Sequence, residues 1–185
     1  MLVLGDSQSA AYGIPVEKGW VSLLQKRLDD NPDKWEVINA SISGDTTGGG
    51  LTRMPAALKR HQPEVVLIEL GGNDGLRGLS LKVMHRNLLK IARMAKEQGA
   101  SVLLLGIRLP ANYGPRYGER FHRVFQEVAR EADVPLVDFF LEGVAENLDL
   151  MQADGIHPSA TAQPRILENV WAALQPIIEP QHALR

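Results

Sequence analysis

Two kinds of hydrophobic pattern alternate along this chain. Short runs of consecutive apolar residues predict strands buried on both faces, because a strand covered by helices on each side needs no polar face. Longer segments, in which apolar residues recur every three or four positions, predict amphipathic helices. Strands are expected at residues 2–4, 35–39, 65–70, 102–107 and 134–137, and helices at about 19–30, 51–60, 80–98, 116–132 and from just after 157 to about 174. Asn31-Pro32 is expected to stop the first helix.

The alternation of strands and helices predicts a parallel sheet with helices on both faces. We therefore expect the α/β class, as a three-layer α/β/α sandwich with a five-stranded parallel sheet, in a single domain over residues 1–185. In such folds ligands bind at the edge formed by the carboxyl ends of the strands. Four polar loops with glycine are expected at that edge: Gly5-Asp6-Ser7, Ser43-Gly44-Asp45, Gly71-Gly72-Asn73-Asp74 and the loop after Ile107.

The first strand leads directly into Gly5-Asp6-Ser7. Gly5 permits a sharp turn, and Asp6 and Ser7 are residues that commonly begin helices, so a helix is expected from about Ser7. Ser7 is then either a nucleophile presented at the sheet edge or only part of a helix cap.

The composition is that of an ordinary soluble globular protein. The 20 Lys and Arg and the 22 Asp and Glu are scattered, and the net charge of −2 gives no basic stripe for nucleic acid. No apolar run approaches the roughly 18 residues of a membrane helix. The chain has no cysteine, which excludes disulfides, thiolate metal sites and cysteine nucleophiles.

A serine hydroxyl becomes a useful nucleophile only when a base removes its proton. His157 is the best placed of the five histidines, because it lies in Asp154-Gly-Ile-His157-Pro158 just before the last predicted helix. Asp154 can reach the second imidazole nitrogen and stabilise the imidazolium, or it can simply cap local backbone in a turn. The other histidines are assigned to a helix end, to helix surfaces and to a polar tail: His61, His85, His122 and His182.

Acyl transfer also needs hydrogen-bond donors for the oxyanion. Gly44 offers a backbone N–H with no side chain in the way, and Asn73 offers its side-chain amide. Ser7 offers its own backbone N–H at the start of the predicted helix. Gly44 and Asn73 are also ordinary turn residues when each is considered alone.

In this order, the blocks Gly5-Asp6-Ser7, Gly44-Asp45, Gly71-x-Asn73-Asp74 and Asp154-x-x-His157 resemble those of the SGNH, or GDSL-type, hydrolase family. The resemblance runs from Leu2 to about Pro176. Longer strings look like the branch of bacterial multifunctional thioesterases, arylesterases and lysophospholipases: Asn39-Ala-Ser-Ile-Ser-Gly-Asp-Thr46, Glu69-Leu-Gly-Gly-Asn-Asp-Gly-Leu-Arg-Gly78, Ile107-Arg-Leu-Pro-Ala-Asn-Tyr-Gly114 and Met151-Gln-x-Asp-Gly-Ile-His-Pro158.

The resemblance implies a flavodoxin-like SGNH hydrolase fold, no cofactor and no metal. It implies Ser7 as nucleophile, His157 as base and Asp154 as its orienter, with an oxyanion hole made by Ser7, Gly44 and Asn73. The implied activity is hydrolysis of carboxylic esters and of acyl thioesters or lysophospholipids, within lipid metabolism. The family's first block usually reads Gly-Asp-Ser-Leu, and this chain has Gln8 at the fourth position.

An acyl chain needs an apolar surface at the same edge of the sheet. The candidates, which are otherwise rim or core residues, are Leu76, Leu79, Ile107, Leu109, Pro110, Met151 and Ile156.

Two other classes stay open on the residues alone. A metal hydrolase would use the aspartates, although their spacing is not that of a preformed metal loop: Asp6, Asp45, Asp74 and Asp154. The other class is a flavodoxin-like binding or signalling domain; a phosphoacceptor domain of this kind would need a lysine after the fifth strand, where Val137 is followed by Asp138.

Small acyl esters or thioesters are the expected partners, with no nucleic acid, no membrane span and a monomeric state. The family resemblance implies a periplasmic or secreted protein. The sequence opens on a predicted core strand and not on a signal peptide, so a cytoplasmic location stays open.

Overall fold

A computed structural model describes residues 1–30 and 35–179, so that Asn31-Pro32 and His182 lie outside the described residues. Five parallel strands form one sheet in the order β2-β1-β3-β4-β5, which confirms the predicted sheet. The strands are β1 (Leu2–Gly5), β2 (Ile38–Asn39), β3 (Val65–Glu69), β4 (Ser101–Leu105) and β5 (Leu136–Val137).

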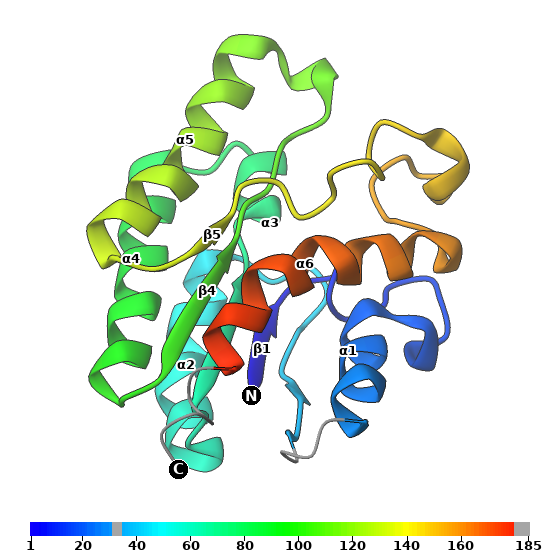
Figure 1. Cartoon of the computed structure of the whole chain (residues 1–185). Helices are drawn as coiled ribbons and strands as arrows, with labels where there is room; N and C mark the ends of the chain where they lie inside the picture. Colours follow the sequence, from blue (N-terminus) through cyan, green and yellow to red (C-terminus); the bar gives the residue numbers. More distant parts are fainter. Residues whose placement is uncertain (31–34, 180–185) are drawn as a thin grey trace.

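Helices cover both faces of the sheet, as Figure 1 shows, and the predicted three-layer arrangement is confirmed. One face carries α1 (Trp20–Asp29) and α6 (Gln163–Ile178), which pack against each other. The other face carries α2 (Thr47–His61), α4 (Leu81–Glu97) and α5 (Pro115–Ala132). The short helix α3 (Gly72–Leu76) lies in the loop after β3, and 3₁₀ turns occupy Val16–Lys18, Ala111–Tyr113, Leu148–Leu150 and Ala160–Ala162.

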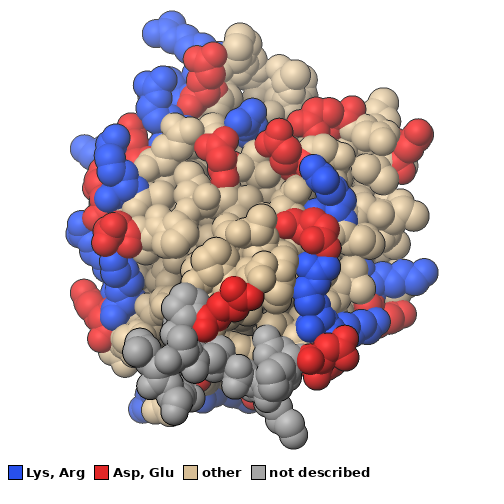
Figure 2. Space-filling view, in the orientation of Figure 1, with Lys and Arg blue, Asp and Glu red and all other residues tan. Residues whose placement is uncertain are grey.

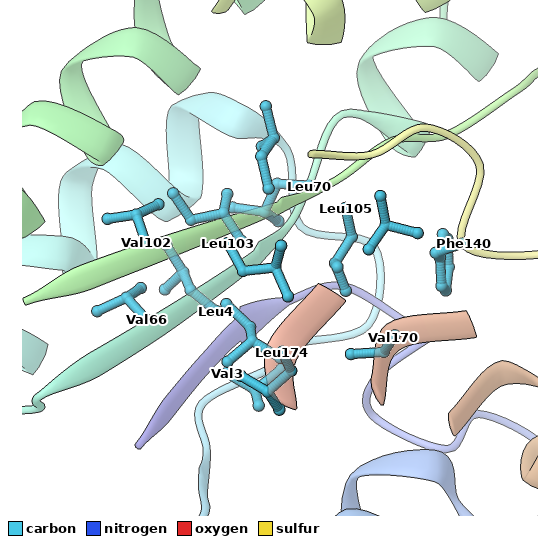
Figure 3. Packing of buried hydrophobic residues seen from close by; sticks show 14 of the residues in the cluster. Val3, Leu4, Val66, Leu70, Val102, Leu103, Leu105, Phe140, Val170 and Leu174 are labelled. Carbon is cyan, nitrogen blue, oxygen red and sulfur yellow. The ribbon is translucent and has the colours of Figure 1, made fainter. Parts of the chain in front are cut away.

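The core lies between the sheet and the two helical layers. Residues 2–4 and 65–68 have no exposed surface, which explains why these strands are apolar without alternation. Figure 3 shows Val170 and Leu174 of α6 packed against the strand residues of the sheet. This burial sets the position of every strand end, and therefore of every loop at the carboxyl edge.

The strand order places a crevice between the loops that follow β1 and β3, at the carboxyl edge of the sheet. The chain passes from β1 to β2 on one side, whereas β3 lies on the other side of β1. Loops that follow such neighbouring strands diverge and leave a crevice, the usual ligand site of open parallel sheets. Ser7 follows β1 and Asn73 follows β3, so both lie at this crevice.

The expected helix at Ser7 is wrong, because residues 7–12 form a series of turns. The Ala10 N–H donates to the Asp6 carbonyl, but the Tyr12 N–H donates to the Ser7 carbonyl five residues back. Ala11 has a left-handed φ of +58°, which ends the helical path after one turn. Gly5 belongs to β1, and a Cβ there would lie 2.8 Å from the Ser9 and Ser41 side chains, so close packing requires this glycine.

Two other helix starts also differ from the prediction. Helix α2 begins at Thr47 and not at 51, because the Thr46 side chain caps it by accepting the Gly49 N–H. Its glycine run, predicted as loop, lets Gly50 approach the side chain of Leu70. The last helix begins at Gln163, since Pro158 is paired with Met151 in an isolated antiparallel bridge.

Basic and acidic side chains are interspersed on the face shown in Figure 2. Within residues 1–30 and 35–179, no helix is both long and apolar enough to cross a membrane.

Replacing Gly50 by alanine is expected to lower the free energy of unfolding by about 1–3 kcal/mol. The new Cβ would lie 2.3 Å from Cδ1 of Leu70, which is fully buried. Gly48→Ala is the matched control, because its Cβ would have no neighbour nearer than 3.6 Å. That variant is expected to gain about 0.5–1 kcal/mol from helix propensity. Urea unfolding followed by circular dichroism measures the free energy of unfolding of both variants. An equal gain in stability for Gly50→Ala and Gly48→Ala would contradict the packing argument.

Candidate active site

Ser7, His157 and Asp154 form a continuous chain of hydrogen bonds. His157 Nε2 lies 2.9 Å from the Ser7 Oγ, and His157 Nδ1 lies 2.7 Å from Asp154 Oδ2. The other Asp154 oxygen, Oδ1, accepts the backbone N–H groups of Ile156 and His157, both at 2.9 Å. The two alternatives considered for Asp154 are therefore both realised, one by each carboxylate oxygen.

The contacts of Asp154 keep it ionised. Burial would raise its pKa, but the hydrogen bonds from the His157 N–H, the imidazole and the Ile156 N–H outweigh burial and lower the pKa to about 2. An ionised Asp154 holds the proton of a neutral imidazole on Nδ1. The lone pair of Nε2 then faces the serine hydroxyl, as a general base requires.

The loop that carries His157 is tied to the turn after β1. The Gln152 side chain donates to the Tyr12 carbonyl at 2.8 Å, and its backbone N–H donates to the His157 carbonyl at 2.7 Å. The Tyr12 ring packs on the imidazole with a centroid separation of 4.6 Å. Ser7 and His157 thus come from opposite ends of the chain and are held together by several side chains.

Gln8, the departure from the usual Gly-Asp-Ser-Leu block, joins the same two segments. Its Nε2 donates to the Ile156 carbonyl at 3.0 Å, and its backbone N–H donates to Asp6 Oδ1 at 3.0 Å. Gln8 is therefore a bridge to the histidine loop and not only a packing change behind Ser7. The sequence signal was a polar residue at a usually apolar position, but its partner lies 148 residues away.

The three predicted oxyanion donors are Ser7, Gly44 and Asn73, and all three line one cavity together with His157. Gly44 occupies a turn with a φ of +78°, a backbone conformation that favours glycine. Asn73 lies in α3, where its Nδ2 donates to Asp6 Oδ2 at 3.0 Å and keeps a second hydrogen. Among the hydrogen bonds of residues 1–30 and 35–179, none uses the N–H groups of Ser7 or Gly44 as donors. Those N–H groups are free to bind an oxyanion.

Two carboxyl groups lie buried beneath the turn that carries Ser7. Burial raises the pKa of Asp6 to about 6, against the hydrogen bonds from Gln8 and Asn73 and the nearby His157. Glu69 is fully buried, and burial followed by the charge of Asp6 raises its pKa well above the ordinary value. Glu69 Oε2 accepts the Ser9 hydroxyl at 2.8 Å and the Asp6 N–H at 3.2 Å.

Sequence reasoning treated Glu69 as an ordinary strand residue. The available signal was a single acidic residue in an otherwise apolar strand, Val65-Val-Leu-Ile-Glu-Leu70. The structure shows a fully buried acid, whose raised pKa favours the protonated form, beneath the turn that carries Ser7.

The cavity has a volume of about 540 Å³ and a largely apolar wall. Six of the predicted substrate-contacting residues line it: Leu76, Ile107, Leu109, Pro110, Met151 and Ile156. Leu79 does not line it and exposes 44% of its surface, because the chain turns away at Gly78. The wall also contains three residues after β5 that the sequence did not suggest: Phe139, Phe140 and Leu141.

The aspartates of the metal-hydrolase alternative contact separate sets of donors. Asp45 pairs with Arg53 at 2.7 Å, and Asp74 accepts the hydroxyl and N–H of Thr47. Asp6 and Asp154 hold the partners described above. In the part of the chain that the structure describes, no three acidic or histidine side chains are grouped as a metal site would need.

Comparisons with known proteins agree with this geometry. Residues 3–163 match the model of the GDSL-like Lipase/Acylhydrolase family. The chain is 57% identical over 178 residues to "Esterase TesA" of Pseudomonas aeruginosa, with 96% of this chain and 89% of the relative covered. It is 48% identical over 182 residues to "Thioesterase 1/protease 1/lysophospholipase L1" of Escherichia coli K12, with 96% and 84% covered.

A solved structure of similar shape is the psychrotrophic esterase EstA from Pseudoalteromonas sp., inhibited by monoethylphosphonate. It superposes with a TM-score of 0.91 at 42% sequence identity, and the match covers 96% of this chain and 97% of that one.

The raised pKa of Glu69 makes stability depend on pH. The folded state favours the protonated acid, so this contribution is fully present below the ordinary pKa of 4.5 and is lost as pH rises toward the folded-state pKa. A glutamine side chain at this position cannot ionise but keeps an acceptor for Ser9 and Asp6. Glu69→Gln is therefore expected to gain stability relative to wild type between about pH 5 and about pH 8.

Urea unfolding at both pH values tests this, with Glu97→Gln at the exposed end of α4 as control. A constant difference between Glu69→Gln and wild type would contradict a neutral Glu69.

Proposed function

Because the chain belongs to the GDSL-like lipase/acylhydrolase family, we propose that it hydrolyses carboxylic esters through an acyl-enzyme formed on Ser7. The activity class itself, serine-based hydrolysis of carboxylic esters, follows from relatives named esterase, arylesterase and thioesterase 1/lysophospholipase L1. The observation that supports the assignment to particular residues is the contact chain from Ser7 Oγ through His157 to Asp154.

The reaction begins when the Ser7 Oγ attacks the ester carbonyl and His157 Nε2 takes the hydroxyl proton. Ionised Asp154 stabilises the imidazolium that results. The negative charge on the carbonyl oxygen is met by the N–H groups of Ser7 and Gly44 and by the free hydrogen of the Asn73 amide.

Collapse of the tetrahedral intermediate breaks the bond to the leaving group, which receives the proton from His157. Water then enters, gives its proton to His157 and attacks the acyl-enzyme. Collapse of the second intermediate returns the proton to Ser7 Oγ and releases the carboxylic acid. The protein regains its starting state, and one water is consumed in each turnover.

The cavity supports substrates with an apolar acyl chain. Leu76, Ile107 and Leu109 face the same space as Ser7 and would cover a hydrocarbon chain. A thiolate is a better leaving group than an alkoxide, so the same groups suffice for acyl thioesters. Lysophospholipids fit the same description, an ester of a long apolar acid.

One catalytic domain over residues 1–185 is part of the proposal, supported by a single core cluster to which buried residues of both helical layers belong. The periplasmic or secreted location and the monomeric state stay predictions from the family resemblance.

Ser7→Ala is expected to lower kcat/KM for p-nitrophenyl butyrate by at least about 10³-fold, because the acyl-enzyme cannot form. Ser22→Ala is the control, since Ser22 lies on α1 and its hydroxyl donates to the Val16 carbonyl of the preceding 3₁₀ turn. Mass spectrometry should show one phosphonyl group added to wild type by a serine-directed phosphonate, and none added to Ser7→Ala. Unchanged esterase rates in Ser7→Ala would refute the nucleophile assignment.

Leu109→Ala is expected to shift the preferred acyl chain length, because it removes apolar surface from the cavity wall. The kcat/KM profile over p-nitrophenyl esters of increasing chain length measures this. Leu79→Ala removes the same side-chain volume outside the cavity and should leave the profile unchanged. Identical profiles for Leu109→Ala and wild type would place the acyl chain elsewhere.

A further inference from the structure

Arg77 contacts both residues that contribute oxyanion donors from outside the nucleophile turn. Its Nη2 donates to the Gly44 carbonyl at 3.0 Å and to Asn73 Oδ1 at 3.3 Å. We propose that Arg77 is a positioning residue, which holds Gly44 and Asn73 in the geometry that binds the oxyanion. This inference rests on the proposed function, since it gives Arg77 a task within the same site.

Arg77 and Asp6 together select one orientation of the Asn73 amide. The amide oxygen faces the guanidinium, and the amide nitrogen faces Asp6 Oδ2 at 3.0 Å. A flipped amide would place N–H against the cation and the oxygen against the carboxyl group, and both contacts would be unfavourable. The selected orientation always presents a donor, and never the amide oxygen, on the side of Asp6 and Ser7.

Arg77 also restrains the turn that carries Gly44. The Asp45 N–H donates to the Ile42 carbonyl at 3.1 Å, and the Gly44 carbonyl at the turn accepts from Arg77. A Cβ on Gly44 would lie 3.5 Å from Arg77 Nη2, so the guanidinium lies directly against the glycine. Arg53 also binds the next residue of this turn, Asp45, at 2.7 Å. Two arginines thus hold this turn.

The two hydrogen bonds of Arg77 join loops on either side of the segment that carries Ser7. Gly44 follows β2, Asn73 follows β3, and β1 with Ser7 lies between these strands. The backbone supplies no direct link between the two outer loops at this point, because each continues into a different helix. Side chains join them instead: the buried Asp74 accepts the N–H and hydroxyl of Thr47, and Arg77 adds the link that reaches Gly44 and Asn73 themselves.

A purely structural role for Arg77 predicts different behaviour. Arg77 is the C-cap residue of α3, but its capping bonds come from the backbone N–H, which any substitution except proline retains. The side chain is exposed, so its loss should affect folding little. Misplaced donors instead weaken binding of the transition state and leave binding of the neutral ester unchanged.

The first experiment measures kcat, KM and thermal stability for Arg77→Gln, with Arg93→Gln on the exposed face of α4 as control. The expected result is a fall in kcat of about tenfold with an unchanged KM and melting temperature, less than the 10²–10³-fold loss of a whole donor. Wild-type kcat in Arg77→Gln, or a change confined to KM, would overturn the proposal.

The second experiment repeats Arg77→Gln in an Asn73→Ala background. One of the two groups that Arg77 holds is then absent, so its effect on kcat should shrink to less than about threefold. An undiminished tenfold loss would show that Arg77 acts independently of Asn73 and would overturn the proposal. Failure of the proposed function has a different signature, which is a wild-type kcat in Asn73→Ala alone.

Discussion

The burial of β1 between β2 and β3 is the constraint on which the rest of the structure depends. Leu2, Val3 and Leu4 are fully buried, and the strand is hydrogen-bonded on both sides. The chain can therefore leave β1 only at the edge where the loops after β2 and β3 also emerge. Ser7 is placed beside Gly44 and Asn73 by the hydrophobic burial of a strand whose own side chains lie outside the cavity.

The buried carboxyl groups connect this core with the chemistry above it. Glu69 lies beside Gly5 in the sheet register and supports the turn through Ser9 and the Asp6 N–H. The raised pKa of Glu69 disfavours a second negative charge next to Asp6, whose carboxyl accepts from both Gln8 and Asn73. Asp6 thus links the turn that carries Ser7 to Asn73, and the hydrogen bonds of the two acids offset only part of their desolvation, since burial still raises both pKa values.

The site combines local and distant restraints. The pair Asp154 and His157 is set by a tight turn in which backbone and side-chain bonds support each other. The contact between His157 and Ser7, in contrast, depends on side chains that join separate loops, such as Gln8 and Gln152. Such bridges place groups with an accuracy that loops on a sheet edge would otherwise lack.

Local pattern in the sequence was sufficient to predict the buried strands, the amphipathic helix from Ser80 to about Gln98, and the blocks around Ser7, Gly44, Asn73 and His157. The strands and the helix follow from periodicity and turn residues, whereas the four blocks were assigned their roles by resemblance to the SGNH hydrolase family. Only the folded arrangement showed that residues 7–12 form turns, that the glycines of α2 are helical and that Leu79 lies outside the cavity. It also assigned partners to Gln8, Glu69 and Arg77. The physical reason is that periodicity records which residues are buried, whereas a hydrogen bond between distant loops exists only after the sheet has brought those loops together.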